Sequence, residues 1–176
     1  MKKIVQKDNK VLREIASEVP VDEITSEKIQ NIIKDMHESL AGERDGVALA
    51  APQIAVSLRI FVISPLAYNY EERDGAEKID PKEISRERKL VFINPKIIWK
   101  SNDSKKMDEG CLSVRPWYGK VKRSSRATVE AYDENGKKFE MEGRGLVAQI
   151  FQHEIDHLEG ILFIDKAKNL KEINLE

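Results

Sequence analysis

The sequence is poor in the residues that mark several specialised classes of protein. A single cysteine, Cys111, rules out a disulfide within the chain, which favours a reducing compartment over a secreted, disulfide-rich fold. The 176 residues include only 9 glycines and 6 prolines, whereas 40% are hydrophobic. This composition is typical of a chain that buries a core, so extensive disorder is excluded. The length suits one domain, which we expect to span residues 1–176.

An excess of one charge and long hydrophobic runs are also missing. The chain has 30 Lys and Arg against 31 Asp and Glu, a formal net charge of −1, which gives no general attraction to nucleic acid or to anionic membranes. Its apolar runs have the length of strands and fall far short of the roughly 20 residues that cross a bilayer. The charged N-terminal residues lack the apolar segment of a signal peptide. We therefore expect a cytoplasmic protein with neither a membrane nor a nucleic acid as its partner.

The hydrophobic pattern predicts helices at two places. Residues 26–40 carry apolar side chains on one helical face, with Ser26 or Thr25 as a candidate N-cap and Gly42 as a stop. Residues 145–158 also show helical spacing, but their apolar side chains spread widely around the axis. A helix that is apolar on so many sides is expected to be central.

Strand signals occupy much of the remaining chain. Residues 59–64 and 89–99 are rich in Ile, Val and Phe, with Asn94-Pro95 breaking the second run, and residues 126–141 alternate around the hairpin signal Asn135-Gly136. The highly charged residues 69–89 are expected to form a solvated loop. The sum predicts an α+β fold in which antiparallel β-sheets pack around one central helix, with an amphipathic helix near the N-terminus.

The predicted central helix carries the pattern His-Glu-x-x-His at His153, Glu154 and His157. Two histidines four positions apart lie about 40° apart around a helix, so both imidazoles can reach one metal ion. Glu154 lies about 100° further round from His153, where it can touch a metal-bound water without binding the metal. Burying these polar side chains is costly unless they are paired or bound, and a metal ion provides that compensation. The pattern therefore indicates metal-assisted hydrolysis.

Two histidines leave a catalytic metal short of one ligand, because such sites usually take three from the protein and keep a fourth position for water. Many aspartates and glutamates are candidates for the third ligand, and so is the single thiol. Cys111 follows Gly110, which allows close backbone approach, so its thiolate could be presented at the rim of a site. An inert, buried thiol is the alternative interpretation of Cys111.

Three motifs of the chain resemble those of the peptide deformylase family. They are GVALAAPQI at residues 46–54, EGCLS at residues 109–113 and QHEIDHL at residues 152–158. Members of this family remove the formyl group from the N-terminal formyl-methionine of newly made polypeptides. The resemblance implies a metal-dependent hydrolase of N-formyl-methionyl nascent peptides, in transient contact with the ribosome. The few residues after the metal helix are not expected to form the long basic C-terminal helix that some members use there.

The resemblance also implies the ligands of the metal. Cys111, His153 and His157 would bind one divalent ion, with water in the fourth position. Thiolate and imidazole ligands suit Zn, Fe, Co and Ni alike, so the ligand types do not decide between these metals. The family points to Fe(II), replaceable by Ni or Co, with Zn as a further occupant.

The same resemblance assigns roles in catalysis and substrate binding. Glu154 would take a proton from the metal-bound water as it attacks the formyl carbon, and would pass that proton to the departing amine. The side-chain amide of Gln53 and the backbone N–H of Leu112 would stabilise the oxyanion. Residues implied to contact the methionine side chain or the peptide backbone are Gly46, Val47, Gly110, Leu146 and Ile150.

Some features depart from the family pattern or leave alternatives open. Ala48 stands where the family usually has Gly, so it would be strained if that position requires a positive φ. Residues 114–119 are bulkier and more aromatic than expected, which would reshape the edge of the cleft. Glu109 either pairs with Arg123 behind Cys111 or is solvated. The rival functions are an endoprotease with another third ligand, an inactive metal-stabilised module, and an N-acyl hydrolase with a different acyl or residue preference.

Overall fold

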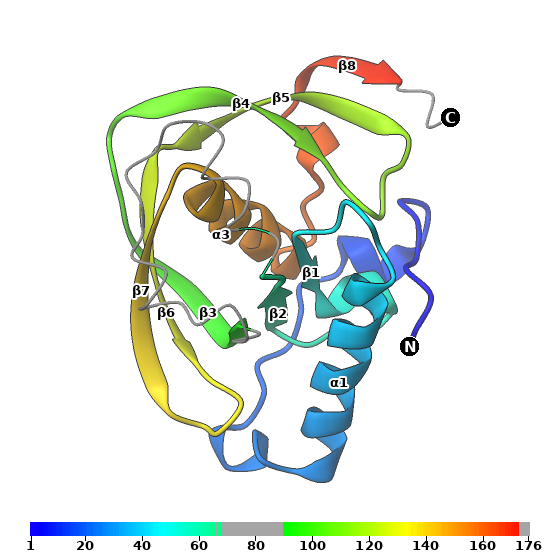
Figure 1. Ribbon diagram of the computed structural model, residues 1–176, viewed down its shortest axis with the longest axis vertical. Coiled ribbons are helices and arrows are strands. Elements are labelled where there is room, and N and C mark those ends of the chain that lie inside the picture. Colours follow the sequence, from blue (N-terminus) through cyan, green and yellow to red (C-terminus); the bar gives the residue numbers. More distant parts are fainter. Residues whose placement is uncertain (66, 68–89, 173–176) are drawn as a thin grey trace.

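A computed structural model describes residues 1–65, 67 and 90–172 (Figure 1). The predicted charged loop at residues 69–89 lies outside the described residues. The helices and strands, in chain order, are α1 (Glu27–Ala41), β1 (Ala48–Ala50), β2 (Ile60–Ile63), β3 (Leu90–Lys100), β4 (Ser104–Gly110), β5 (Trp117–Ser124), β6 (Arg126–Tyr132), β7 (Lys138–Arg144), α3 (Gly145–Leu158) and β8 (Lys168–Glu172). Among the described residues, no helix has both the length and the apolar composition that a membrane crossing requires.

Two antiparallel sheets enclose the helix α3, as Figure 1 shows. One sheet has five strands in the order β1-β2-β3-β6-β7, and the other has three in the order β4-β5-β8. Helix α3 contacts strands of both sheets, so its apolar side chains are covered on several sides. The predicted α+β fold with antiparallel sheets around a central helix is confirmed.

The aromatic centre of the core fixes the position of α3. Phe61 and Phe92, on neighbouring strands, stack with ring centroids 4.4 Å apart, and Phe151 of α3 meets Phe92 edge-on at 5.4 Å. All three side chains are fully buried, and each such burial stabilises the fold by about 1.5–3 kcal/mol. Because His153 lies only two residues after Phe151, this packing also places the metal-binding part of the helix.

The amphipathic helix α1 forms where the sequence predicted it. The Ser26 hydroxyl accepts a hydrogen bond from the backbone N–H of Ile29 at 3.4 Å, and Gly42 follows the last helical residue. Its apolar face, which includes Ile29, Ile33 and Met36, is buried against β1 and β2. This contact holds the segment that leads into β1 and, beyond it, into the cleft.

Strand β3 differs from the prediction at Asn94-Pro95, because the strand continues through the break as a bulge. The pairing of β3 with β6 shifts register between Ile93 and Lys96, and Asn94 has a φ of 51°. A bulge tolerates a proline that lacks an N–H group. The side chain of Asn94 accepts from the Val19 N–H at 2.8 Å and donates to the Val19 carbonyl at 2.7 Å. The apparent break is therefore a tether for the N-terminal part of the chain.

Two turns require a residue with positive φ. Gly136 closes the β6–β7 hairpin with a φ of 77°, and Gly160 follows α3 with a φ of 70°. A Cβ atom at residue 136 would meet nothing within 4 Å, whereas one at residue 160 would lie 2.7 Å from the Arg13 carbonyl oxygen. The turn after α3 therefore lies directly against the N-terminal segment.

This difference predicts unequal effects of the same substitution. Gly136→Ala should lower the free energy of unfolding by about 1–2 kcal/mol, the cost of the left-handed conformation alone. Gly160→Ala should lower it by roughly 2–4 kcal/mol, because the new methyl group must also displace the backbone at Arg13. Urea denaturation of both variants and the parent protein measures the difference. Equal losses in the two variants would contradict the close contact at Gly160.

Candidate metal centre and cleft

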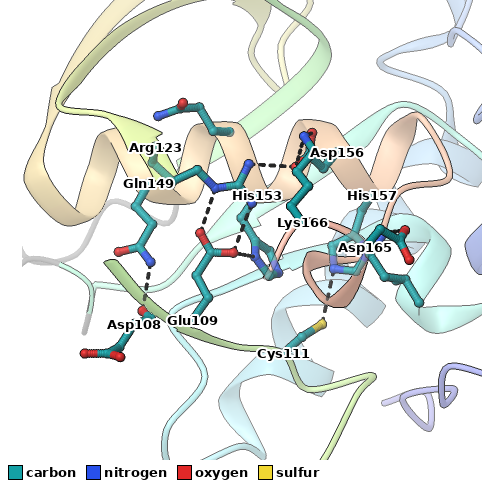
Figure 2. Close-up of polar contacts among 12 residues, drawn as sticks. Asp108, Glu109, Cys111, Arg123, Gln149, His153, Asp156, His157, Asp165 and Lys166 are labelled. Carbon is teal, nitrogen blue, oxygen red and sulfur yellow. Dashed lines mark hydrogen bonds and ion pairs between the residues drawn. The ribbon is translucent and has the colours of Figure 1, made fainter. Parts of the chain in front are cut away.

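The fold brings together one thiol and two imidazoles from distant parts of the chain. Cys111 follows the end of β4, whereas His153 and His157 lie on successive turns of α3 (Figure 2). Their potential ligand atoms all lie within 4.8 Å of one another, and the Cys111 Sγ atom is 3.3 Å from the His157 Nε2 atom. This is the predicted ligand set. The endoprotease interpretation needed a different third ligand, and within the described ranges no other group of three such residues is found.

A buried carboxylate orients His153. The Nδ1 atom of His153 is 3.0 Å from the Glu109 Oε2 atom, and Arg123 donates to Glu109 from Nε at 2.7 Å and from Nη2 at 3.0 Å. Burial alone would raise the pKa of Glu109, but the hydrogen bonds from His153 and Arg123 outweigh it and lower that pKa to about 2. An ionised Glu109 accepts from Nδ1–H, so the Nε2 lone pair of His153 is left for a metal. Glu109 thus pairs with Arg123 and is not solvated.

The support for His153 continues to the surface. Arg123 also donates from Nη1 to Asp156 at 2.7 Å, and Asp156 accepts from the Lys166 ammonium at 2.8 Å (Figure 2). Opposite charges therefore alternate from Glu109 outward. Because a buried charge is costly without a partner, this alternation allows Glu109 to stay ionised with only 4% of its surface exposed.

The electrostatics of the two histidines fit a cation at this place. Burial alone would lower the pKa of His153, but its hydrogen bonds to Cys111 and Glu109 raise that pKa well above its usual value. The position between Cys111 and Glu109 therefore favours a positive charge, which can be either a proton on His153 or a bound metal cation. Burial lowers the pKa of His157, which keeps its imidazole in the neutral form that binds metals. A catalytic metal site has three protein ligands and one position open to water or substrate, and three potential ligands beside a cleft match that arrangement.

Glu154 carries one of the three buried side-chain atoms without a hydrogen-bond partner in the described part of the chain, the others being His157 Nδ1 and Ser125 Oγ. The unpaired atom of Glu154 is Oε2, and the residue is only 4% exposed. Burial raises the pKa of Glu154 to about 7. A carboxyl group with this pKa can both accept and donate a proton near neutral pH.

The orientation of the Gln53 amide is fixed by its partners. Its Oε1 atom accepts from the backbone N–H of Ala50 at 2.8 Å, so the amide nitrogen must point the other way. That nitrogen lies 3.2 Å from the Ser113 hydroxyl oxygen and 3.5 Å from the Cys111 sulfur. Gln53 therefore presents N–H donors beside the metal-binding thiol.

A cleft of about 360 Å³ opens beside these groups. The sequence analysis predicted eleven site residues, and ten of them line the cleft: Gly46, Val47, Gln53, Gly110, Cys111, Leu112, Leu146, Ile150, His153 and Glu154. The eleventh, His157, is not among the lining residues. The cleft lies between two sheet edges, because β1 is the last strand of one sheet and β4 the last strand of the other.

The cleft wall also includes Arg115 and Tyr118, from the segment at residues 114–119, and three residues that the sequence analysis missed: Asp45, Asp108 and Gln149. Gln149 had a signal that could have found it, because it lies one helical turn before His153. Asp45 and Asp108 come from a loop and a strand end that only the tertiary structure brings to the cleft.

The departures noted in the sequence have structural outcomes. Ala48 lies in β1 and is not among the described residues with positive φ, so it is not strained. Arg115, from the unusual segment at residues 114–119, donates to Glu43 at 2.8 Å and to Asp45 at 2.5 Å across the edge of the cleft. A Cβ atom on Gly110 would lie only 2.3 Å from the Tyr118 ring, so the ring packs directly on the glycine. This segment shapes one edge of the cleft, as expected.

Comparison with known families decides the identity of this arrangement. Residues 1–172 match the family model described as polypeptide deformylase. The chain belongs to the peptide deformylase family. As a member it is a metal-dependent hydrolase with peptide deformylase activity, and the family implies formylated nascent peptides as substrates.

Individual deformylases agree with this assignment in sequence and fold. The peptide deformylase of Thermomicrobium roseum is 40% identical over 147 residues, which cover 83% of this chain and 76% of that protein. The crystal structure of a peptide deformylase from Legionella pneumophila has 38% identity and a TM-score of 0.78, covering 96% of this chain and 87% of the other. A class I type b enzyme from Acinetobacter baumannii, determined with Met-Ala-Ser bound, has 29% identity and a TM-score of 0.79, covering 94% and 98%.

The buried ion pair predicts a large effect of removing its cation. Arg123→Met leaves Glu109 buried without its main partner, so the free energy of unfolding should fall by about 3–5 kcal/mol. The metal should bind about 10- to 100-fold more weakly, because His153 loses its oriented support. Urea denaturation and competition with a metal chelator measure these two changes.

The control for this variant is Lys120→Met on the same strand. Lys120 pairs with Asp108 at the surface, where an ion pair contributes only about 0–1 kcal/mol. This substitution should leave metal affinity unchanged. If Arg123→Met behaved like Lys120→Met in both measurements, the chain of charges would not support the metal site.

Proposed function

We propose that this deformylase removes the formyl group from N-formyl-methionyl peptides in the cleft between β1 and β4, with Glu154 carrying the proton. The observation that carries this assignment is the Glu154 carboxyl group, which is buried and unpaired beside the Cys111, His153 and His157 cluster. An unpaired buried carboxyl group destabilises a fold, so its presence beside the cluster favours a functional role, and the role we propose is proton transfer to and from the substrate.

The peptide substrate would bind as an extended strand. Both walls of the cleft end in sheet edges, and Gly46 and Gly110 offer backbone groups there, so a peptide can add main-chain hydrogen bonds to either side. This mode reads the backbone and tolerates many residues after the methionine. The Met-Ala-Ser peptide held by the Acinetobacter baumannii enzyme supports the same substrate class for this chain.

The methionine side chain would enter an apolar pocket. Val47, Leu146 and Ile150 line the cleft and also pack against the main hydrophobic core. Because these side chains are held by core packing, this part of the cleft is preformed and apolar. It therefore favours an apolar side chain such as that of methionine.

The proton would move through Glu154. A bound divalent metal supplies Lewis-acid chemistry, since it polarises the formyl carbonyl group and lowers the pKa of water. Glu154 would accept a proton from the attacking water and donate it to the nitrogen of the departing amine. A pKa of about 7 suits both steps. The Gln53 amide and the Leu112 N–H would donate to the oxygen on which negative charge develops.

We also propose the metal and the cellular place of the enzyme. Fe(II) is the proposed native ion, with Ni(II), Co(II) and Zn(II) as further ions that a thiolate and two imidazoles accept. The enzyme would act in the cytoplasm, in transient contact with the ribosome, where formylated chains emerge. The residues after α3 support no helical docking element within the described ranges, because Lys168–Glu172 form the strand β8 and pair with β5.

Replacing one oxygen of Glu154 tests its role. Glu154→Gln keeps the shape of the side chain but cannot accept the proton, so formate release from formyl-Met-Ala-Ser should fall by about 10²–10⁴-fold. Bound metal per chain should remain unchanged, since Glu154 is not one of the three ligands. The control is Glu140→Gln, an exposed position on β7. Full activity of Glu154→Gln at normal metal content would contradict the proposal.

Metal exchange tests the proposed native ion. Protein loaded with Fe(II) without oxygen should release formate and then lose activity in air, because an open iron–thiolate site reacts with oxygen. Protein loaded with Ni(II) should keep its activity under the same exposure. The measurement is formate release and metal content before and after air. Equal stability of both forms would count against an oxygen-accessible iron bound to Cys111.

A further inference from the structure

The N-terminal segment, residues 2–7, joins the two loops that carry the oxyanion donors. The backbone N–H of Val5 donates to the Gln53 carbonyl oxygen at 2.9 Å. The side-chain amide of the next residue, Gln6, donates to the Leu112 carbonyl oxygen at 3.1 Å. We call residues 2–7 the strap. Adjacent residues of the strap thus hold two loops that lie far apart in the sequence.

The strap is itself anchored on both sides. Ile4 is only 8% exposed and belongs to the hydrophobic cluster beneath α1, whereas Val5 packs against the separate cluster that contains Leu12 and Val114. Before them, the Lys2 N–H donates to the Ser39 hydroxyl at 2.9 Å, and that hydroxyl donates back to the Lys2 carbonyl at 2.8 Å. The strap is therefore fixed to the packed core, and through its hydrogen bonds it can restrict the motion of the two loops that it joins.

The two loops need such a connection because the donors they carry act together. Gln53 comes from the turn after β1 and Leu112 from the loop after β4, and these strands belong to different sheets. The described contact between the loops on the cleft side is the Gln53 amide, which lies near Ser113 and Cys111. A hydrogen-bond donor stabilises a developing charge only when its distance is held within narrow limits.

We propose that the strap positions the oxyanion donors of the deformylase, with Gln6 as a positioning residue that holds Leu112. This inference rests on the proposed roles of Gln53 and Leu112. Gln6 is not among the residues that line the cleft, and its side chain bonds to the backbone of Leu112. Its effect is on the transition state, because donor placement matters most where charge develops.

The test replaces the donor without changing the size of the side chain. Gln6→Met should lower kcat about five-fold, the typical effect of one neutral hydrogen bond, and should leave KM for formyl-Met-Ala-Ser unchanged. Gln6→Arg keeps N–H donors of similar reach and should restore most of the lost kcat. The matched control is Lys3→Met, an exposed residue of the same strap. Metal content and the midpoint of thermal unfolding should match the parent protein in all variants.

Amide hydrogen exchange provides a measurement that needs no turnover. Gln6→Met should speed exchange at residues 111–113, whereas Lys3→Met should not. An unchanged kcat, or a fall in kcat matched by loss of metal, would overturn the proposal. If the parent protein released no formate, the proposed function would fail, but hydrogen exchange would still test the role of the strap. Unchanged exchange at residues 111–113 in Gln6→Met would show that Gln6 does not hold this loop.

Discussion

The ion pair between Glu109 and Arg123 is the interaction on which the rest of the site depends. Their side chains are only 2% and 4% exposed, so burying each charge is tolerated because the other is present. The pair joins β4 to β5 and reaches α3 through His153 and Asp156. It therefore sets the distance between Cys111, two residues beyond Glu109, and the helix that carries both histidines.

This constraint explains why the metal helix can be central. A helix packed between two sheets would normally exclude charged side chains, because their transfer from water is costly. On α3 the polar side chains gather toward the three-stranded sheet, where Gln152 and Asp156 find partners on β5. The opposite side carries Phe151 into the aromatic core. One helix can thus serve as the core of the fold and as the support of a reactive centre.

The sequence was most informative where structure follows from local pattern. Residues 145–158 showed both the helical period and the ligand spacing, so the central helix and two ligands could be predicted together. The third ligand needed the family resemblance, because no local pattern links Cys111 to His153 and His157, which lie far along the chain on another element. Asn94-Pro95 was interpreted too simply, since the hydrogen bonds that turn the break into a bulge come from Val19, on another part of the chain.

The features that escaped prediction share one physical cause. The ion pairs of Arg115 and the strap both act across the boundary between the two sheets, and such contacts leave no periodic signal in the sequence. The cleft lies along that boundary, and beside it Cys111, in the loop after β4, meets the two histidines of α3. A metal bound there would join that loop to α3, so its free energy of binding would add to the stability of the fold. The chemistry and the cohesion of the molecule therefore depend on the same narrow interface, and the strap and the Arg115 pairs hold it from its edges.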